Sequence, residues 1–258
     1  MQVEKVAAHI QTWLDEYLSS VGLKGFIVGI SGGIDSAVVS KLCAMTGHKT
    51  ILMTMPIRQT KSEYDRAWLH MKALEKEFQN VEIMEVDLTS TFETFEKCMP
   101  FELDVNHLAM ANSRARLRMT TLYAVGQAHG CLVVGTGNKV EDFGIGFYTK
   151  YGDGGVDISP IADINKTQVF AVAKEIEIIP EIQNAKPTDG LFEDGRSDED
   201  QIGATYPELE WAMEFAGDET TITEREKEVL RIYRRLNSIN QHKMVPIPIC
   251  KIPVRLLS

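Results

Sequence analysis

The chain has 258 residues, of which 44% are apolar and 25% are charged, and its formal net charge is −10. These values are ordinary for a globular protein and exclude a collagen, a fibre or an intrinsically disordered chain. No apolar run reaches the roughly 18 residues that a membrane-spanning helix needs, and the first residues lack the apolar block of a signal peptide.

The acidic charge is concentrated in one part of the chain. Residues 189–228 contain 14 acidic and 3 basic side chains, so the rest of the chain is nearly neutral. A protein that binds duplex nucleic acid usually has a basic excess, which this sequence lacks. The cysteines are scattered without a C-x-x-C pair, which is typical of neither a disulfide framework nor a zinc site. We therefore expect a cytoplasmic protein that binds neither nucleic acid nor a membrane.

Apolar periodicity predicts strands and helices that alternate along the first two thirds of the chain. The expected helices are residues 3–20, 34–45, 61–78, 106–129 and 165–176. The expected strands are residues 26–30, 50–55, 81–86 and 131–134, with a fifth at 156–158. This order predicts an α/β fold: a doubly wound parallel sheet with right-handed crossovers and helices on both faces.

The remaining residues predict a smaller helical part. The acidic stretch 189–204 is expected to form a loop, and we interpret it as a lid that closes over a nucleotide. Helices are expected at 207–215 and 223–238, followed by a proline-containing tail that lies extended on the body. We expect a single domain over residues 1–258, with a core over about 22–185 and the lid and helical appendage over about 186–258.

A glycine-containing loop follows the first strand directly. Its sequence is Ser31-Gly-Gly-Ile-Asp-Ser36, and a helix begins within it. Two consecutive glycines allow a sharp turn that brings bare backbone N–H groups against a ligand, and the helix N-terminus adds unpaired donors. Asp35 offers a hard oxygen for Mg²⁺. The loop predicts a site for an oligophosphate with its metal, although ordinary helix capping would also favour serine and aspartate here.

The loop resembles that of the ATP pyrophosphatases, enzymes that cleave ATP between the α- and β-phosphates. It differs from the G-x-x-x-x-G-K-[ST] loop of kinase-like enzymes and from the G-x-G-x-x-G loop of dinucleotide dehydrogenases. A second stretch narrows the resemblance. Gly135-Thr-Gly-Asn-Lys-Val-Glu141 and Gly146-Phe-Tyr-Thr-Lys-Tyr-Gly-Asp-Gly-Gly-Val-Asp157 are similar to the signature of the NH3-dependent NAD synthetase family.

The family resemblance extends over nearly the whole chain and implies a two-step reaction. The nicotinate carboxylate of deamido-NAD attacks the α-phosphorus of ATP and releases pyrophosphate. Ammonia then displaces AMP from the adenylate. Glutamine-dependent relatives carry an additional N-terminal amidohydrolase domain, and only about 25 residues precede the first strand here, so we expect ammonia as the direct nitrogen donor.

The resemblance also implies a role for individual residues. Asp35, Glu141 and Lys166 match the catalytic positions, and Asp35 and Glu141 match the ligands of Mg²⁺, the implied cofactor. The residues that match ATP-binding positions are Gly29, Ile30, Ser31, Gly32, Gly33, Ile34, Asp35, Ser36, Thr136, Lys166 and Thr188. The residues that match deamido-NAD-binding positions are Arg116, Lys150, Asp157, His242 and Lys243.

Each of these residues also has an ordinary structural explanation. Arg116 lies in a row with Arg114 and Arg118 on a predicted helix, where a basic row is often a solvated face. Arg114 and Arg118 are four residues apart and share a side of that helix, so Arg116 points elsewhere. Taken alone, Glu141 would be a surface acid, Lys166 a helix-surface lysine, and His242 and Lys243 a solvated pair. Lys150 and Asp157 flank a glycine-rich turn that by itself would be only a loop.

Two departures from the bacterial family pattern lie near Glu141. The segment from Glu141 to Lys150 is one residue longer, which leaves the alignment of this loop open. Gly137-Asn138-Lys139 stands where bacterial relatives have Asp-His-Ala. Neither change removes a chemical role.

The family resemblance further implies a homodimer whose deamido-NAD site lies between subunits. Helix 106–129 offers apolar side chains that suit either such an interface or the core, namely Leu108, Met110, Leu117, Met119 and Leu122.

Two other functions stay open at this point. One is a tRNA-modifying or nucleotide-amidating ATP pyrophosphatase, although loop cysteines and a basic face are lacking. The other is a nucleotide-binding module without turnover, which would not need two metal-binding carboxylates.

Overall fold

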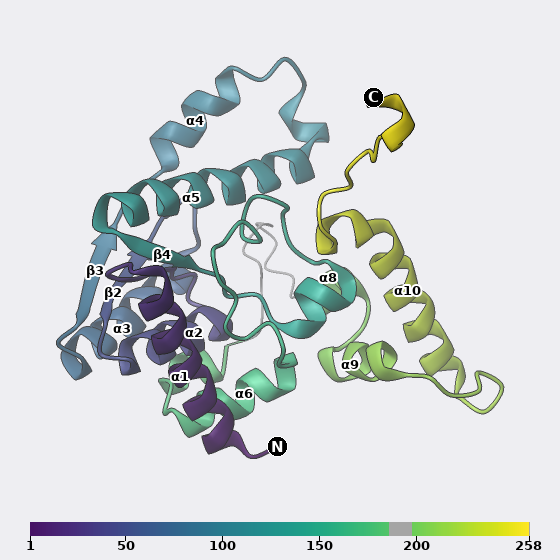
Figure 1. The fold of residues 1–258 in the computed structure, drawn as a ribbon, viewed down its shortest axis with the longest axis horizontal. Helices are drawn as coiled ribbons and strands as arrows, with labels where there is room; N and C mark the ends of the chain where they lie inside the picture. The colour runs from purple at the N-terminus through teal and green to yellow at the C-terminus, as the bar shows by residue number, and fades with distance from the viewer. Residues whose placement is uncertain (186–197, 258) are drawn as a thin grey trace.

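The computed structural model describes residues 1–185 and 198–257. Its centre is a four-stranded sheet with the strand order β3-β2-β1-β4, in which every pairing is parallel (Figure 1). The strands are β1 (Gly25–Gly29), β2 (Lys49–Thr54), β3 (Val81–Glu85) and β4 (Cys131–Val134). The four principal strands predicted from the sequence are confirmed, each to within one residue at either end.

The predicted fifth strand is wrong. Residues 156–158 make only one parallel bridge, between Val134 and Ile158, in which the Gly135 amide donates to the Ile158 carbonyl. Pro160 follows two residues later and lacks an amide hydrogen, so this segment turns away at the end of β4 instead of extending the sheet.

The two faces of the sheet bury two separate sets of side chains. Phe26 and Val28 of β1 point into one cluster and Ile27 into the other, because successive side chains of a strand point to opposite faces. The first face is covered by α1 (Val3–Val21), α2 (Ile34–Met45), α3 (Lys61–Glu77) and α6 (Lys166–Glu175). The second is covered by α4 (Thr89–Lys97) and α5 (His107–His129) (Figure 1). The predicted doubly wound α/β architecture is therefore confirmed.

Helix α4 was missed by the sequence prediction. It has nine residues, and Phe92 is the single side chain of this helix that is buried. One buried position in a short segment gives no recognisable helical period.

The strand order reverses between β1 and β4. From β1 the chain builds β2 and β3 in one direction, and then returns through α4 and α5 to place β4 on the other side of β1. Loops that leave the carboxyl ends of two such strands diverge, and the space between them is where doubly wound sheets bind ligands.

The C-terminal helices pack around a third apolar cluster. They are α8 (Asp198–Ile202), α9 (Tyr206–Glu214) and α10 (Glu224–Met244), and α9 and α10 lie against the π-helical turn η2 (Lys139–Ile145). The short α7 (Pro180–Gln183) instead buries Ile182 in the cluster on the first face of the sheet. Both predicted helices of this region are confirmed, but α10 ends at Met244 instead of residue 238. Pro246 disfavours helical geometry at Val245 and so sets this end.

The acidic stretch and the tail differ from their predictions. Residues 189–197 of the expected lid lie outside the described residues, and residues 198–202 form helix α8 rather than a loop. The tail after α10 is irregular apart from the short turn η3 (Val254–Leu256), but it does not lie on the body: Ile249 and Val254 are each 81% exposed. The longer α10 directs the tail away from the sheet (Figure 1). Within the described residues, no helix combines the length and apolarity needed to cross a bilayer.

Candidate active site

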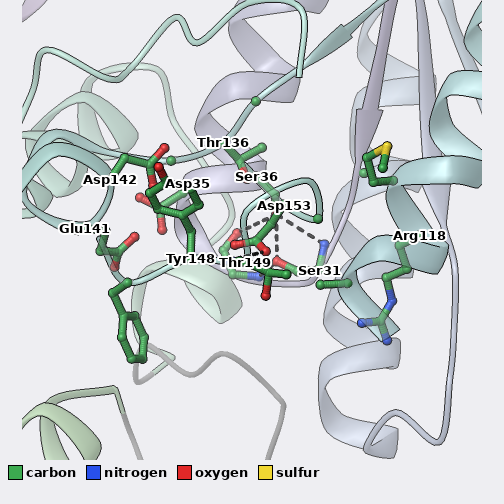
Figure 2. A pocket seen from close by; sticks show the side chains of 18 of the residues that line it. Ser31, Asp35, Ser36, Arg118, Thr136, Glu141, Asp142, Tyr148, Thr149 and Asp153 are labelled. Carbon is green, nitrogen blue, oxygen red and sulfur yellow. Dashed lines mark hydrogen bonds between the residues drawn. The ribbon is translucent and has the colours of Figure 1, made fainter. Parts of the chain in front are cut away.

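A cavity of about 550 Å³ opens at the carboxyl ends of β1 and β4, where the strand order reverses. Its walls come from the loop after β1, the turn after β4, η2 and one side of α5 (Figure 2). The whole predicted phosphate loop lines it, and so do Thr136, Glu141 and Lys166. Thr188, the remaining ATP-binding prediction, lies outside the described residues.

The phosphate loop is a tight turn that requires glycine. Gly32 has a φ of 88°, and a Cβ at this position would lie 2.5 Å from the carbonyl oxygen of Glu63 in α3. The Ser31 hydroxyl accepts a hydrogen bond from the Gly33 amide at 3.1 Å, and it lies 3.1 Å from the Ser36 hydroxyl. This closes the turn over the start of α2.

The first turn of α2 leaves its backbone donors available. The amides of residues 34–36 have no hydrogen-bond acceptor in the part of the chain that the structure describes. A helix N-terminus with free amides and the positive end of the helix dipole binds anions. The geometry therefore suits a phosphate group at this loop.

Three predicted catalytic residues meet at one edge of the cavity. The Lys166 ammonium donates to Asp35 Oδ2 at 2.5 Å and to Glu141 Oε1 at 3.1 Å. Lys166 begins α6, Asp35 lies in the first turn of α2, and Glu141 lies in η2, so three separate segments build the cluster. Its side chains are only 4% (Lys166), 17% (Asp35) and 14% (Glu141) exposed.

Asn138 connects the two carboxylates from the other side. Its Nδ2 donates to Asp35 Oδ1 at 3.2 Å and to Glu141 Oε2 at 2.7 Å, and its Oδ1 accepts the Glu141 amide at the start of η2. The side chain is fully buried. The sequence marked this position as a departure from the bacterial pattern but gave it no role, because its partners are set by the fold.

Tyr206 joins the C-terminal helices to the same cluster. Its hydroxyl donates to Glu141 Oε1 at 2.5 Å and lies 3.1 Å from Asp198 Oδ2, and its ring lies 4.9 Å from the Lys166 ammonium. Burial, together with the Glu141 and Asp198 carboxylates, raises the pKa of Tyr206, so the hydroxyl keeps its proton and acts as a donor. No sequence signal indicated this residue, since its helix was predicted only from residue 207 onward and its hydroxyl contacts a distant segment.

Burial and charge oppose each other in this cluster. Burial disfavours a charged Lys166, but the Asp35 and Glu141 carboxylates outweigh that effect and raise the pKa of the ammonium. Burial raises the pKa of Glu141, the Lys166 charge opposes this rise, and the Asp35 charge adds to it. The ammonium is thus a cation held where two carboxylates converge.

The same convergence fits a hard divalent cation. Carboxylate oxygens are the protein ligands that Mg²⁺ uses, usually one or two of them together with substrate phosphates and water. No group of three or more potential metal-binding His, Cys, Asp or Glu side chains occurs among the described residues. The protein would therefore supply Asp35 and Glu141, and phosphate and water oxygens would complete the coordination.

Six further charged residues that the sequence did not predict line the cavity: Glu63, Arg66, Arg118, Asp142, Asp153 and Asp198. Burial raises the pKa of Asp142, and the neighbouring Glu141 carboxylate adds to this rise. Arg118 donates from Nε to the Met55 carbonyl at 3.0 Å. Arg66 donates from Nε to the Gly32 carbonyl of the phosphate loop at 3.4 Å.

Of the residues predicted to bind deamido-NAD, only Lys243 lines the cavity. Its ammonium donates to the carbonyls of Gly146 and Tyr148, each at 2.8 Å. The others lie outside the cavity lining, namely Arg116, Lys150, Asp157 and His242.

Three of these outer residues are linked to one another. Arg116 Nε donates to the Lys150 carbonyl at 3.2 Å, and the Lys150 ammonium donates to the His242 carbonyl at 2.6 Å. Asp157 instead accepts the Tyr123 hydroxyl and the Val133 amide at the end of β4. All these contacts are at least partly exposed, so the outer residues are ordered but accessible.

Comparison with known proteins gives a consistent set of matches. Residues 6–246 match the model of the family described as NAD synthase. An NH(3)-dependent NAD(+) synthetase of Alkaliphilus metalliredigens is 35% identical over 96% of this chain and 97% of that protein. The NH(3)-dependent NAD(+) synthetase of Finegoldia magna is 37% identical, over 81% of this chain and 84% of that protein.

Two solved structures are similar over almost the full chain. The NMN synthetase of Francisella tularensis superposes with a TM-score of 0.86 at 27% identity, covering 98% of this chain and 100% of that one. The NH3-dependent NAD synthetase of Campylobacter jejuni shares the fold, with a TM-score of 0.74 at 23% identity, covering 97% and 100%.

Proposed function

The chain belongs to the NAD synthase family of ATP-dependent ligases, which form NAD from deamido-NAD and ammonia, and we propose that Asp35, Glu141 and Lys166 are its catalytic centre. The observation that carries this proposal is the convergence of both carboxylates on the Lys166 ammonium, beside a loop of free amides in one cavity. The reaction forms the carbon–nitrogen bond of the nicotinamide group of NAD.

The proposed reaction has two steps. A carboxylate oxygen of the nicotinate ring forms a bond to the α-phosphorus of ATP, and the bond from that phosphorus to the bridging oxygen breaks, releasing pyrophosphate. Ammonia then forms a bond to the acyl carbon, the bond from that carbon to the AMP oxygen breaks, and the nitrogen releases one proton to give the amide. Positioning and charge neutralisation dominate such chemistry, because no protein nucleophile is required.

The phosphate loop and the cluster of Asp35, Glu141 and Lys166 have separate roles in this reaction. The free amides of residues 34–36 and the hydroxyls of Ser31 and Ser36 bind phosphate oxygens next to Asp35. We propose that Asp35 and Glu141 hold Mg²⁺, which when bound supplies positive charge to the phosphates. Lys166 keeps the two carboxylates in place and adds a positive charge at the same point.

The outer residues support a second part of the proposal, a homodimer. Arg116, Lys150, Asp157 and His242 are accessible next to the cavity but do not line it, so a ligand that touches them must extend out of it. We propose that deamido-NAD does so and that a second subunit covers it there.

Exposed apolar side chains on α5 and the tail support this interface, with Leu108 64% and Ile249 81% exposed. Met110, Leu117 and Leu122 of α5 instead pack in the core. A monomeric mass by light scattering, in an active preparation at micromolar concentration, would contradict the dimer.

The cellular location is a smaller proposal. Cys98 and Cys250 are exposed free cysteines, and such thiols are typical of proteins in a reducing compartment. We propose a cytoplasmic enzyme, which fractionation of cells that express it would test.

A second substrate is favoured by one comparison. The Francisella protein with a TM-score of 0.86 is an NMN synthetase. Nicotinate mononucleotide carries the same reactive carboxylate as deamido-NAD but lacks the adenylate half. Supplying both nucleotides together and measuring the two products would decide which one this enzyme prefers.

One assay tests the activity. Purified protein receives ATP, Mg²⁺, deamido-NAD and ammonium, and NAD formation is followed with an alcohol dehydrogenase. NAD should form with ammonium and not with glutamine alone. AMP release without NAD would indicate another ATP pyrophosphatase, and the absence of any turnover would indicate a nucleotide-binding module.

Two variants test the catalytic centre. Asp35→Ala and Glu141→Ala should each lose most turnover, mainly in kcat. Glu219→Gln, at an exposed ion pair with Arg234, is the matched control and should retain activity. Near-normal rates in both alanine variants would contradict the assignment.

A further inference from the structure

The phosphate loop contains no basic side chain of its own. Residues 29–36 include neither lysine nor arginine, although the diphosphate that leaves ATP is strongly anionic. Loops of kinase-like enzymes place a lysine at this point. Positive charge near the loop must therefore come from other segments of the fold.

Arg118 brings a guanidinium to the cavity from α5. Its Nε is fixed by the Met55 carbonyl at the end of β2, and no carboxylate of the described residues forms an ion pair with it. Burial lowers the pKa of Arg118 to about 10, the charge of Arg114 lowers it further, and Glu63 and Asp153 offset only part of this effect. The side chain is a largely buried cation without a paired anion in the part of the chain that the structure describes.

Arg66 brings a second guanidinium from α3. Its Nε donates to the Gly32 carbonyl, and α3 approaches the loop so closely that only glycine fits at position 32. Arg66 also forms no ion pair within the described residues, and it lines the same cavity. In both arginines the Nε position is used for anchoring, which leaves the terminal nitrogens for a ligand.

Arg118 lies on the side of the phosphate loop away from the catalytic cluster, and Arg66 contacts the backbone of the same loop at Gly32. In Figure 2, Ser31 lies between Arg118 and the pair formed by Asp35 and Glu141. An ATP whose α-phosphate reaches that pair can extend its remaining phosphates across the loop toward Arg118. We propose that Arg66 and Arg118 bind the β- and γ-phosphates of ATP and hold the pyrophosphate when it is released.

This inference rests on the proposed function, since it assigns the groups that receive the leaving charge of the first step. When the bond from the α-phosphorus to the bridging oxygen breaks, its electron pair stays on the pyrophosphate. Guanidinium N–H groups then donate to an oxygen that has gained charge, and no proton needs to move. The planar fork of arginine suits paired phosphate oxygens better than the single ammonium of lysine does.

Direct binding of inorganic pyrophosphate is the test. Calorimetry in the presence of Mg²⁺ compares the wild type with Arg118→Gln and Arg66→Gln. Loss of a hydrogen-bonded charge typically weakens binding by about 10- to 100-fold, which we expect for Arg118→Gln, with a smaller loss of about 3- to 10-fold for Arg66→Gln. Arg231→Gln, at an exposed position of α10, is the matched control and should bind pyrophosphate as tightly as the wild type does.

Two further ligands separate this role from others. AMP lacks the β- and γ-phosphates, so its affinity should stay within about twofold in every variant. The affinity of deamido-NAD should also be unchanged. If deamido-NAD binding falls instead while pyrophosphate binding is retained, the arginines serve the diphosphate of the dinucleotide and the proposal is wrong.

The variant Arg118→Lys distinguishes a loss of phosphate binding from a purely structural effect of the substitution. It keeps the charge but loses the fork, so pyrophosphate affinity should lie between those of the wild type and Arg118→Gln. Unchanged pyrophosphate affinity in both Arg118 variants overturns the proposal even if the wild type makes NAD. If the wild type makes no NAD but binds pyrophosphate, and the Arg118 variants bind pyrophosphate more weakly, the proposed function is wrong and the arginine site is supported.

Discussion

The buried cluster and the outer residues lie at the same end of the sheet, but their charges are satisfied in different ways. In the buried cluster, Asp35, Glu141 and Lys166 pair side chain to side chain at 2.5 and 3.1 Å. Among the outer residues, Arg116 and Lys150 donate to backbone carbonyls in exposed positions.

This difference separates a centre that is fixed before ligands arrive from a surface that can still change. A buried charge needs its partner in place, because removing that partner leaves a charge in a poorly solvated position. An exposed lysine on a carbonyl can exchange that contact for water or for a ligand. Substitutions in the buried cluster should therefore lower stability and turnover, and substitutions among the outer residues should mainly weaken substrate affinity.

The largest effect is expected for Lys166→Met. It leaves Asp35 and Glu141 facing each other in a buried position, so the free energy of unfolding should fall by about 3–5 kcal/mol and kcat by about 10³-fold or more. Urea unfolding in the presence of EDTA measures the free energy of unfolding, and the NAD assay measures kcat. Lys72→Met removes a lysine from an exposed ion pair with Glu75 and should change stability by less than about 1 kcal/mol. Equal effects of the two substitutions would remove the distinction between buried and exposed charges.

A second buried polar pair extends the comparison to pH. His70 of α3 is 1% exposed, and its Nε2 lies 2.8 Å from the Ser40 hydroxyl of α2. Burial lowers the pKa of His70 to about 4, and the charge of Lys41 adds to this. The unfolded chain therefore takes up a proton below pH 6.5 that the folded chain refuses, so this contribution to stability is lost as the pH falls from 6.5 toward 4.

The measurable consequence is a pH-dependent difference between variants. Between pH 7 and pH 5 the lowered pKa corresponds to about 2 kcal/mol of unfolding free energy, which His70→Gln should no longer lose. Urea unfolding at both pH values provides the measurement. His242→Gln, at an exposed histidine, should keep the pH dependence of the wild type. An unaltered pH dependence in His70→Gln would show that this histidine is not the group responsible.

Tyr206→Phe tests how the C-terminal helices support the buried cluster. It removes the hydroxyl that donates to Glu141 and keeps the ring beside Lys166. The expected loss is about 1–2 kcal/mol of unfolding free energy, with Mn²⁺ affinity about 10-fold weaker by electron paramagnetic resonance. Tyr64→Phe also removes a hydroxyl that donates to a glutamate, Glu85, but at the surface, and should change neither quantity. Wild-type Mn²⁺ affinity in Tyr206→Phe would contradict the supporting role.

The smallest effect on stability is expected for Lys150→Ala among the outer residues. Its exposed contact with the His242 carbonyl should contribute less than about 0.5 kcal/mol to unfolding, because water replaces it. The KM for the nicotinate substrate should nevertheless rise several-fold, with kcat and the KM for ATP unchanged. A large loss of stability with an unchanged KM would place Lys150 in the structural group instead.

The four main strands and the phosphate loop were predictable because their signals are local. Strands β1, β2 and β4 contain short apolar runs with β-branched residues that are buried on both faces, and β3, at the edge of the sheet, shows Val81 and Ile83 in alternation with polar or less buried residues. The loop is likewise contiguous: its glycines, hydroxyls and helix N-terminus all lie within residues 31–36. The family motif added Glu141 and Lys166, which the fold then placed together.

The sequence by itself thus determined the α/β alternation and the loop that faces phosphate. Only the tertiary structure decided which arginine of α5 enters the cavity: Arg118 does and Arg116 does not. Helix α5 has apolar and polar residues on all sides, so its sequence does not indicate which side faces inward. Asn138 and Tyr206 could not be predicted for a related reason, since their partners come from distant segments. Contacts between side chains far apart in the chain depend on how helices pack, and no local pattern records that packing.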